Sequence, residues 1–196
     1  MNLRYGQPGE GAAFYSAGLH PWFLREENFA SACDWLADQA GRSDVLAIGE
    51  AGLDKVTDTP WPLQMAAFQR CVEISETVRK PLIIHCVRAF SEIMALKKQW
   101  KTAQPWVFHG FDKNLQTAEM LLKAGCYLSY GAALFLPKHP AAASLQSTAS
   151  DRFFLETDDS DTGIEDIYQK AAGLRGISLL DMSQYLEENF RHVFKM

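Results

Sequence analysis

Short apolar runs alternate along this chain with longer segments in which apolar residues recur at helical spacing. The apolar runs predict strands, and the longer segments predict helices. The predicted strands cover residues 2–5, 13–17, 45–48, 82–84, 105–108, 126–129 and 152–155. The predicted helices cover residues 26–40, 61–79, 90–100, 115–123, 165–174 and 178–194, and a loop with a short helix precedes the last strand.

Strict alternation of strands and helices predicts an α/β fold, with a parallel sheet and helices packed outside it. Seven predicted strands are one fewer than the eight of a closed TIM-type barrel. No repeat, linker or low-complexity run divides the sequence. We therefore expect a single TIM-barrel-like (β/α) domain over residues 1–196.

The composition is that of an ordinary soluble enzyme, with 47% apolar and 22% charged residues. The formal net charge of -5 means that a nucleic-acid partner needs a local basic patch or bound cations to offset its phosphates. The 4 cysteines are widely spaced, which is typical of reduced thiols. No signal peptide or membrane-spanning run is visible, so we expect a cytoplasmic protein without membrane contact.

Polar side chains follow five of the predicted strands, at the point where each apolar run ends. These residues are His20, Glu50, His85, His109 and Asp158. Because the carboxyl ends of parallel strands share one rim, we expect these side chains to converge. A single histidine after a strand is more often a hydrogen-bonded structural residue, but the joint pattern favours a functional site.

Mixed imidazole and carboxylate ligands suit a catalytic divalent ion that keeps a coordination position open for water. Mg, Mn and Zn all fit such a donor set, and one or two sites are expected. One glutamate can bridge two ions, and paired ions stabilise the attacking and leaving oxygens of a phosphodiester. Bound cations would also let an acidic protein accept an anionic substrate.

Several segments together resemble the TatD-type metal-dependent hydrolases, many of which are deoxyribonucleases, within the amidohydrolase-like barrel superfamily. The matching segments are Ala17-Gly-Leu-His-Pro-Trp22, Ala47-Ile-Gly-Glu-Ala-Gly-Leu-Asp54, Pro81-Leu-Ile-Ile-His-Cys86, Phe108-His-Gly-Phe111, Phe154-Leu-Glu-Thr-Asp158 and Asn189-Phe-Arg-His-Val-Phe194. They keep the order of the family and run from about residue 17 to the C-terminus.

The resemblance implies roles for four of the rim residues. Glu50 matches the carboxylate that bridges the metals, and His85 and His109 match the two imidazoles of one site. Asp158 matches the carboxylate after the last strand, which also orients the attacking water. Glu50 and Asp158 are therefore the expected catalytic carboxylates.

Two further residues are expected to contact the substrate. His20 matches a family position near the rim and is expected to contact a phosphate or a metal ligand. Arg88, three residues after His85, has a planar fork that can hold a phosphate. A solvated charge at the start of a helix is the equally weighted interpretation of Arg88.

One family feature is missing from the sequence. Family members begin with a His-x-His pair on the first strand, and this chain contains no such pair. Residues 2–5 match the second strand, so we expect an incomplete barrel without the first strand and helix, through a truncated start or a natural short form. One metal site would then lack two ligands, and the open barrel edge would favour self-association or a partner.

The function favoured by the sequence is a metal-dependent hydrolase that cleaves DNA phosphodiesters with a metal-activated water, trimming single-stranded ends. The alternative is a catalytically impaired or inactive relative that binds metal or serves as a scaffold. A third possibility is an amide or ester substrate on the same rim, because this barrel supports many chemistries.

Overall fold

The computed structural model describes residues 1–6 and 11–195. The glycines and proline of residues 6–11 predict a turn, most of which lies outside the described residues. The chain forms two compact units, Met1–Trp106 and Val107–Met196. No described helix has both the length and the apolarity that a membrane crossing requires.

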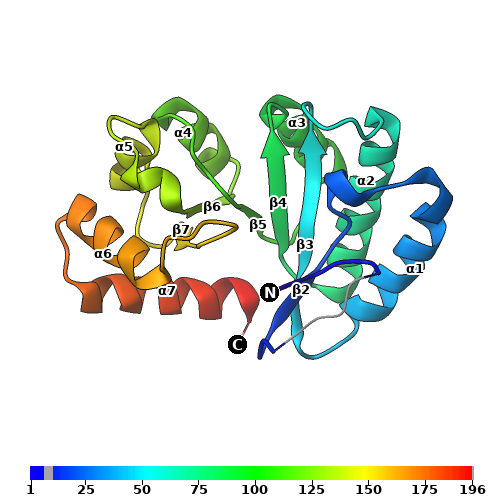
Figure 1. Cartoon of the computed structure of the whole chain (residues 1–196), viewed down its shortest axis with the longest axis horizontal. Coiled ribbons are helices and arrows are strands. Elements are labelled where there is room, and N and C mark those ends of the chain that lie inside the picture. Colours follow the sequence, from blue (N-terminus) through cyan, green and yellow to red (C-terminus); the bar gives the residue numbers. More distant parts are fainter. Residues whose placement is uncertain (7–10, 196) are drawn as a thin grey trace. The chain divides into compact units, whose positions relative to one another are not determined.

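The first unit consists of parallel strands in chain order with helices against them. The strands are β1 (Asn2–Leu3), β2 (Tyr15–Ala17), β3 (Val45–Asp54) and β4 (Leu82–Val87), and each pairs in parallel with the next. The helices are α1 (Phe29–Ala40), α2 (Trp61–Val78) and α3 (Phe90–Trp100), with short 3-10 turns η1 (Pro21–Phe23) and η2 (Glu26–Asn28) before α1. Figure 1 shows α1 and α2 side by side along β3.

The apolar stripe predicted on α2 is the face that packs on the strands. Leu63, Ala67, Cys71 and Ile74 are buried there. The helix packs against β3, where Ile48 is also fully buried. Burial of this stripe, rather than intrinsic propensity, stabilises the helix and holds β3 and β4 in place.

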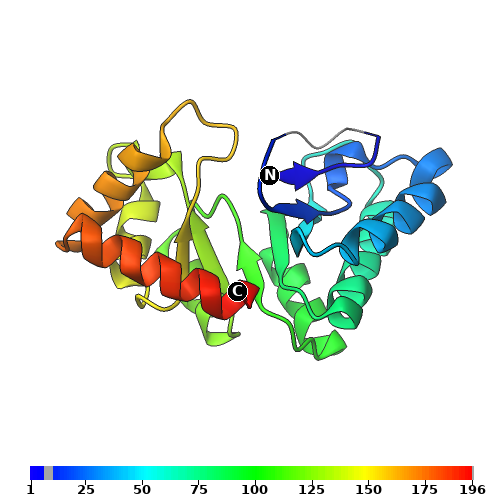
Figure 2. The ribbon, with the colours of Figure 1, turned by 90° about the horizontal axis from the view of Figure 1, so that it is seen from below.

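The second unit repeats the same alternation. Its strands are β5 (Trp106–Phe108), which starts at the last residue of the first unit, β6 (Tyr127–Tyr130) and β7 (Phe153–Leu155), with parallel pairing from β5 to β7. Its helices are α4 (Leu115–Lys123), the 3-10 turn η3 (Ala132–Phe135), α5 (Pro140–Ser147), α6 (Ile164–Arg175) and α7 (Leu179–Phe194). Figure 2 shows α6 beside α7, and a capping box at Ser178 starts α7.

The predicted ends of β3 and β4 are wrong. The sequence predicts that β3 ends at Ile48 and β4 at Ile84, but the strands continue to Asp54 and Val87. The parallel ladder is made by backbone groups and continues from Ala51 to Asp54 opposite β4, so polar side chains do not interrupt it. Glu50 and His85 therefore lie within strands rather than after them.

Gly52 explains how the two strands meet beside these polar residues. It lies opposite His85 in the ladder, with a φ of +156°. A Cβ at Gly52 would lie 1.9 Å from the His85 carbonyl oxygen. Only glycine tolerates both this backbone conformation and this close approach.

Candidate metal centre

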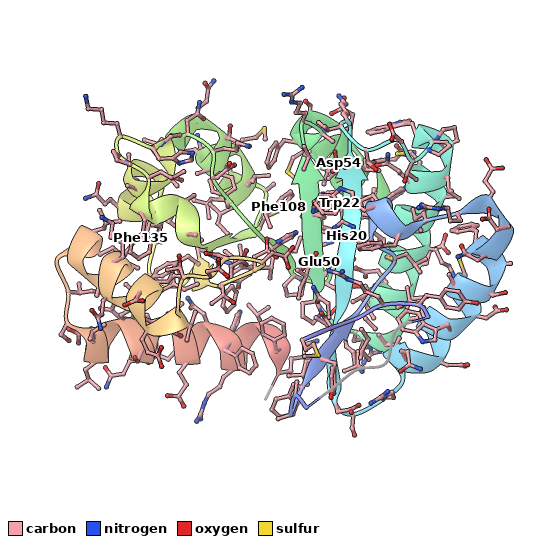
Figure 3. All side chains as sticks on the ribbon, in the orientation of Figure 1. His20, Trp22, Glu50, Asp54, Phe108 and Phe135 are labelled. Atoms are coloured by element: carbon pink, nitrogen blue, oxygen red, sulfur yellow. The ribbon has the colours of Figure 1, made fainter. Side chains whose placement is uncertain are left out.

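His20, Glu50 and His85 form a compact group in the first unit. Each offers one potential ligand atom, and these atoms lie within 4.8 Å of one another. His20 Nε2 is 3.5 Å from Glu50 Oε2, and the centroids of the two imidazole rings are 4.4 Å apart. Figure 3 shows His20 and Glu50 close together beside β3. The side chains come from the segment after β2, from β3 and from β4.

The register of β3 and β4 explains why His85 meets two carboxylates. Glu50, Gly52 and Asp54 alternate along β3 and share one face of it. His85 is paired with Gly52, so its side chain rises between Glu50 on one side and Asp54 on the other. The glycine leaves the space that the backbone of His85 occupies.

Asp54 is the carboxylate that contacts His85 directly. Asp54 Oδ2 is 3.1 Å from His85 Nε2, and it also accepts a 2.7 Å hydrogen bond from the Trp22 indole. Asp54 Oδ1 accepts from the Val56 amide at 2.7 Å. Burial raises the pKa of Asp54, but the hydrogen bonds from Trp22, Val56 and His85 outweigh it, and the pKa lies below its usual value. Asp54 is therefore an anion that accepts hydrogen bonds.

His20 is fixed by the chain that follows it. Its Nδ1 accepts a hydrogen bond from the Trp22 amide at 3.1 Å, as the N-cap of η1. In the neutral ring the proton then resides on Nε2, the nitrogen that faces Glu50. This arrangement suits a hydrogen-bond donor better than a metal ligand.

Glu50 has a second neighbour that the sequence did not indicate. The side-chain amide of Asn2 on β1 donates to Glu50 Oε1, and the Ser16 hydroxyl donates to Asn2 Oδ1. One carboxylate oxygen of Glu50 therefore faces a neutral amide, while the other faces His20. The Glu50 side chain is only 12% exposed.

A second polar group lies in the second unit, between the ends of β5 and β7. His109 Nδ1 is 3.6 Å from Glu156 Oε1 and 3.9 Å from Asp158 Oδ2. The Gly110 amide donates to Glu156 Oε1 at 2.5 Å, which fixes that carboxylate beside the histidine. Asp158 has a left-handed backbone (φ 48°) and a side chain that is 47% exposed.

The structure thus brings the predicted residues together in two groups. Glu50 and His85 meet in the first unit, with His20, while His109 and Asp158 meet in the second. The prediction that Glu50, His85, His109 and Asp158 bind metal at one site stays a prediction. Arg88 is exposed after β4, and its contact with phosphate also stays a prediction.

Sequence reasoning missed Asp54, Asn2 and Glu156. Asp54 lies four residues after Glu50, so a strand extended through it would have placed both carboxylates on one face. Glu156 precedes Asp158 by two residues, so the sequence already offered a second carboxylate directly after the last strand. The Asn2 contact depends on the pairing of β1 with β2 and left no local signal.

The donor chemistry in the first unit fits a divalent cation. His85 offers the lone pair of Nδ1, because Nε2 faces the anionic Asp54, and Glu50 offers a carboxylate oxygen. Imidazole nitrogen and carboxylate oxygen are common ligands for Zn and Mn. In such metal sites, a histidine ligand commonly donates its second ring N–H to a carboxylate, as His85 does to Asp54 here.

An open pocket of about 450 Å³ adjoins Trp22 in the first unit. Trp22, Leu24, Pro60 and Leu63 supply apolar lining, while Glu26, Glu27 and Asp58 add carboxylates and Arg25 a single guanidinium. The excess of negative charge makes this pocket a poor site for phosphate.

The family model described as "TatD related DNase" matches residues 3–195 of the chain. The uncharacterized metal-dependent hydrolase YcfH of Escherichia coli K12 is 26% identical over 92% of this chain and 73% of its own length. The 3'-5' ssDNA/RNA exonuclease TatD of Edwardsiella piscicida is 30% identical over 73% of this chain and 56% of its own length.

Among solved structures, the TatD homologue YjjV of Escherichia coli K12 superposes on this chain with a TM-score of 0.83 and 20% sequence identity. The superposition covers 93% of this chain and 77% of the YjjV chain. This likeness confirms the predicted α/β, TIM-barrel-like fold class. The matched family model extends over both compact units. This chain belongs to the TatD related DNase family.

Proposed function

We propose that this chain is a divalent-metal-dependent hydrolase that cleaves phosphodiester bonds of single-stranded DNA. The observation that carries the proposal is the position of His85, which Asp54 holds within metal-ligand distance of Glu50. Membership of the TatD related DNase family supports the reaction class. The exonuclease name of the Edwardsiella relative supports a single-stranded nucleic acid as substrate.

A bound divalent ion supplies Lewis-acid polarisation of the phosphate and lowers the pKa of water to a value useful near neutrality. His85 Nδ1 and Glu50 would hold this ion. The Nε2–H of His20 would donate to a phosphate oxygen, and Asp158 keeps the role of proton acceptor that the family resemblance predicts for it. Arg88 adds a phosphate contact that partly offsets the net charge of -5.

One observation favours the alternative of an impaired, metal-binding relative. The Asn2 amide donates to Glu50 Oε1, the oxygen that a carboxylate needs when it bridges two ions. A chain in this state would hold one ion at Glu50 instead of a pair. One ion is sufficient for hydrolysis in many metalloenzymes, so this contact limits the mechanism without removing it.

A substrate panel tests the proposal against its alternatives. The metal-stripped protein is reloaded with Mg, Mn or Zn and incubated with end-labelled single-stranded DNA, single-stranded RNA, and chromogenic ester and amide substrates. Metal-dependent release of nucleotides from DNA supports the proposal. Hydrolysis of only the ester or amide substrates, or of none of the panel by a protein that binds metal at Glu50, contradicts it.

A further inference from the structure

We infer that Asp54 is a positioning residue that selects which nitrogen of His85 faces the metal, and that Trp22 holds Asp54 in this role. The inference rests on the part of the proposed function that places an ion at Glu50 and His85. It does not depend on the identity of the substrate.

One carboxylate oxygen of Asp54 has two nitrogen neighbours. Asp54 Oδ2 lies 2.7 Å from the Trp22 indole nitrogen and 3.1 Å from His85 Nε2. An indole N–H only donates, and an ionised carboxylate only accepts. His85 Nε2 must therefore carry a proton to bond the same oxygen. The neutral ring then has its lone pair on Nδ1.

Hydrogen bonds hold Asp54 in this orientation. The side chain of Gln64 accepts from the Asp54 amide at 2.8 Å and donates to the Asp54 carbonyl at 3.0 Å. The Val56 amide holds Oδ1, and the residue is only 2% exposed. A carboxylate fixed at both oxygens and at its backbone gives its neighbour a defined orientation.

Two aromatic rings also pack against the His85 ring. The Trp22 ring meets it edge-on, with centroids 5.5 Å apart and an interplanar angle of 77°. The His20 ring packs at 4.4 Å. Figure 3 shows Trp22 and Asp54 beside β3, with His20 and Glu50 farther along. Trp22 is 48% exposed, so a side chain that is partly at the surface donates a hydrogen bond to the buried Asp54.

Removal of such a carboxylate partner typically weakens metal binding by about 10–100-fold, because the imidazole loses its orientation and basicity. We expect Asp54→Asn to weaken Zn²⁺ binding by about that factor. Trp22→Phe should give a smaller loss, since it removes one donor and leaves the carboxylate. Asp58→Asn, an exposed change in the loop after β3, and Trp61→Phe are the matched controls and should leave the affinity unchanged.

The test measures Zn²⁺ affinity of the metal-stripped full chain by calorimetry and the tautomer of His85 by nitrogen-15 NMR. A proton on Nε2 of wild-type His85, together with the loss in Asp54→Asn, supports the inference. A proton on Nδ1, or wild-type affinity in a folded Asp54→Asn protein, overturns it. Should Asp54→Asn fail to fold, the wild-type tautomer and the Trp22→Phe affinity decide the question.

The same data separate this inference from the proposed function. A wild-type protein that binds Zn²⁺ through Glu50 and His85 but cuts no DNA contradicts the proposed function and leaves the role of Asp54 standing. A protein that cuts DNA while Asp54→Asn retains full Zn²⁺ affinity and full folding supports the proposed function and overturns the role of Asp54.

Discussion

Gly52 lies directly opposite His85 in the ladder between β3 and β4, and a Cβ on Gly52 would lie 1.9 Å from the His85 carbonyl oxygen. The missing side chain lets the backbone of His85 approach β3 between Glu50 and Asp54. The close approach of β3 and β4 beside the candidate metal centre therefore depends on a residue that has no side chain.

Gly52→Ala is expected to destabilise the protein by at least about 2 kcal/mol, because the clash is with backbone and the φ is unfavourable for alanine. Urea unfolding followed by circular dichroism measures the change. Gly173→Ala on α6 is the control, since a Cβ there meets nothing within 4 Å and alanine favours a helix. Equal stability of the two variants would contradict the assigned role of Gly52.

The burial of the Cys71 thiol leads us to expect that the protein loses stability at alkaline pH. Burial raises the pKa of its thiol to about 12, from a usual value of 9.0. Above pH 9 the unfolded chain releases this proton and the folded chain keeps it. Each pH unit between the two pKa values therefore lowers the unfolding free energy by about 1.4 kcal/mol.

Unfolding curves at pH 8 and pH 10 measure this effect. In Cys71→Ala the difference between the two pH values should shrink by about 1 kcal/mol relative to wild type. Iodoacetamide should also leave Cys71 of the folded protein unmodified. A slope that is identical in wild type and Cys71→Ala would contradict the burial of the thiol.

His109 is predicted from the sequence to bind the same ion as Glu50 and His85. On that basis His109→Ala should weaken binding of this ion by at least about tenfold, because one of its ligands is lost. Calorimetry with Zn²⁺ on the metal-stripped protein provides the measurement. His192→Ala, an exposed position on α7, serves as the control. Unchanged affinity in His109→Ala would show that the two polar groups act separately.

The Asn2 contact predicts the number of ions that depend on Glu50. Because Asn2 occupies Glu50 Oε1, we expect Glu50→Gln to remove one Zn²⁺ per chain, as counted by elemental analysis. Asn2→Ala should not reduce that count. Loss of two ions in Glu50→Gln would show that the carboxylate bridges a pair.

The sequence predicts helices well and strand ends poorly. The predicted helices at Phe90–Trp100 and Leu115–Lys123 are confirmed at both ends, since an amphipathic period is readable along the chain. The ends of β3 and β4 were wrong because the ladder between them depends on the partner strand, which the local pattern does not reveal.

The local sequence pattern is equally limited in predicting the contacts of the candidate metal centre. The convergence of Glu50 and His85 was predictable, since parallel strands bring their polar residues to one region. The contacts of Asp54 with His85 and of Asn2 with Glu50 were not, because they depend on register and on side-chain orientation. The orientation of His20 likewise follows from its capping of η1 rather than from its place after a strand.

The most direct test is release of nucleotides from end-labelled single-stranded DNA as a function of added divalent metal. We would compare the wild type with Glu50→Gln and with Glu73→Gln, an exposed carboxylate change on α2 that controls for contaminating nuclease. We predict metal-dependent release by wild type and Glu73→Gln, and a loss of about 100-fold or more in folded Glu50→Gln, because its ligand charge is gone. Equal release by all three proteins would contradict the proposed metal-dependent hydrolase.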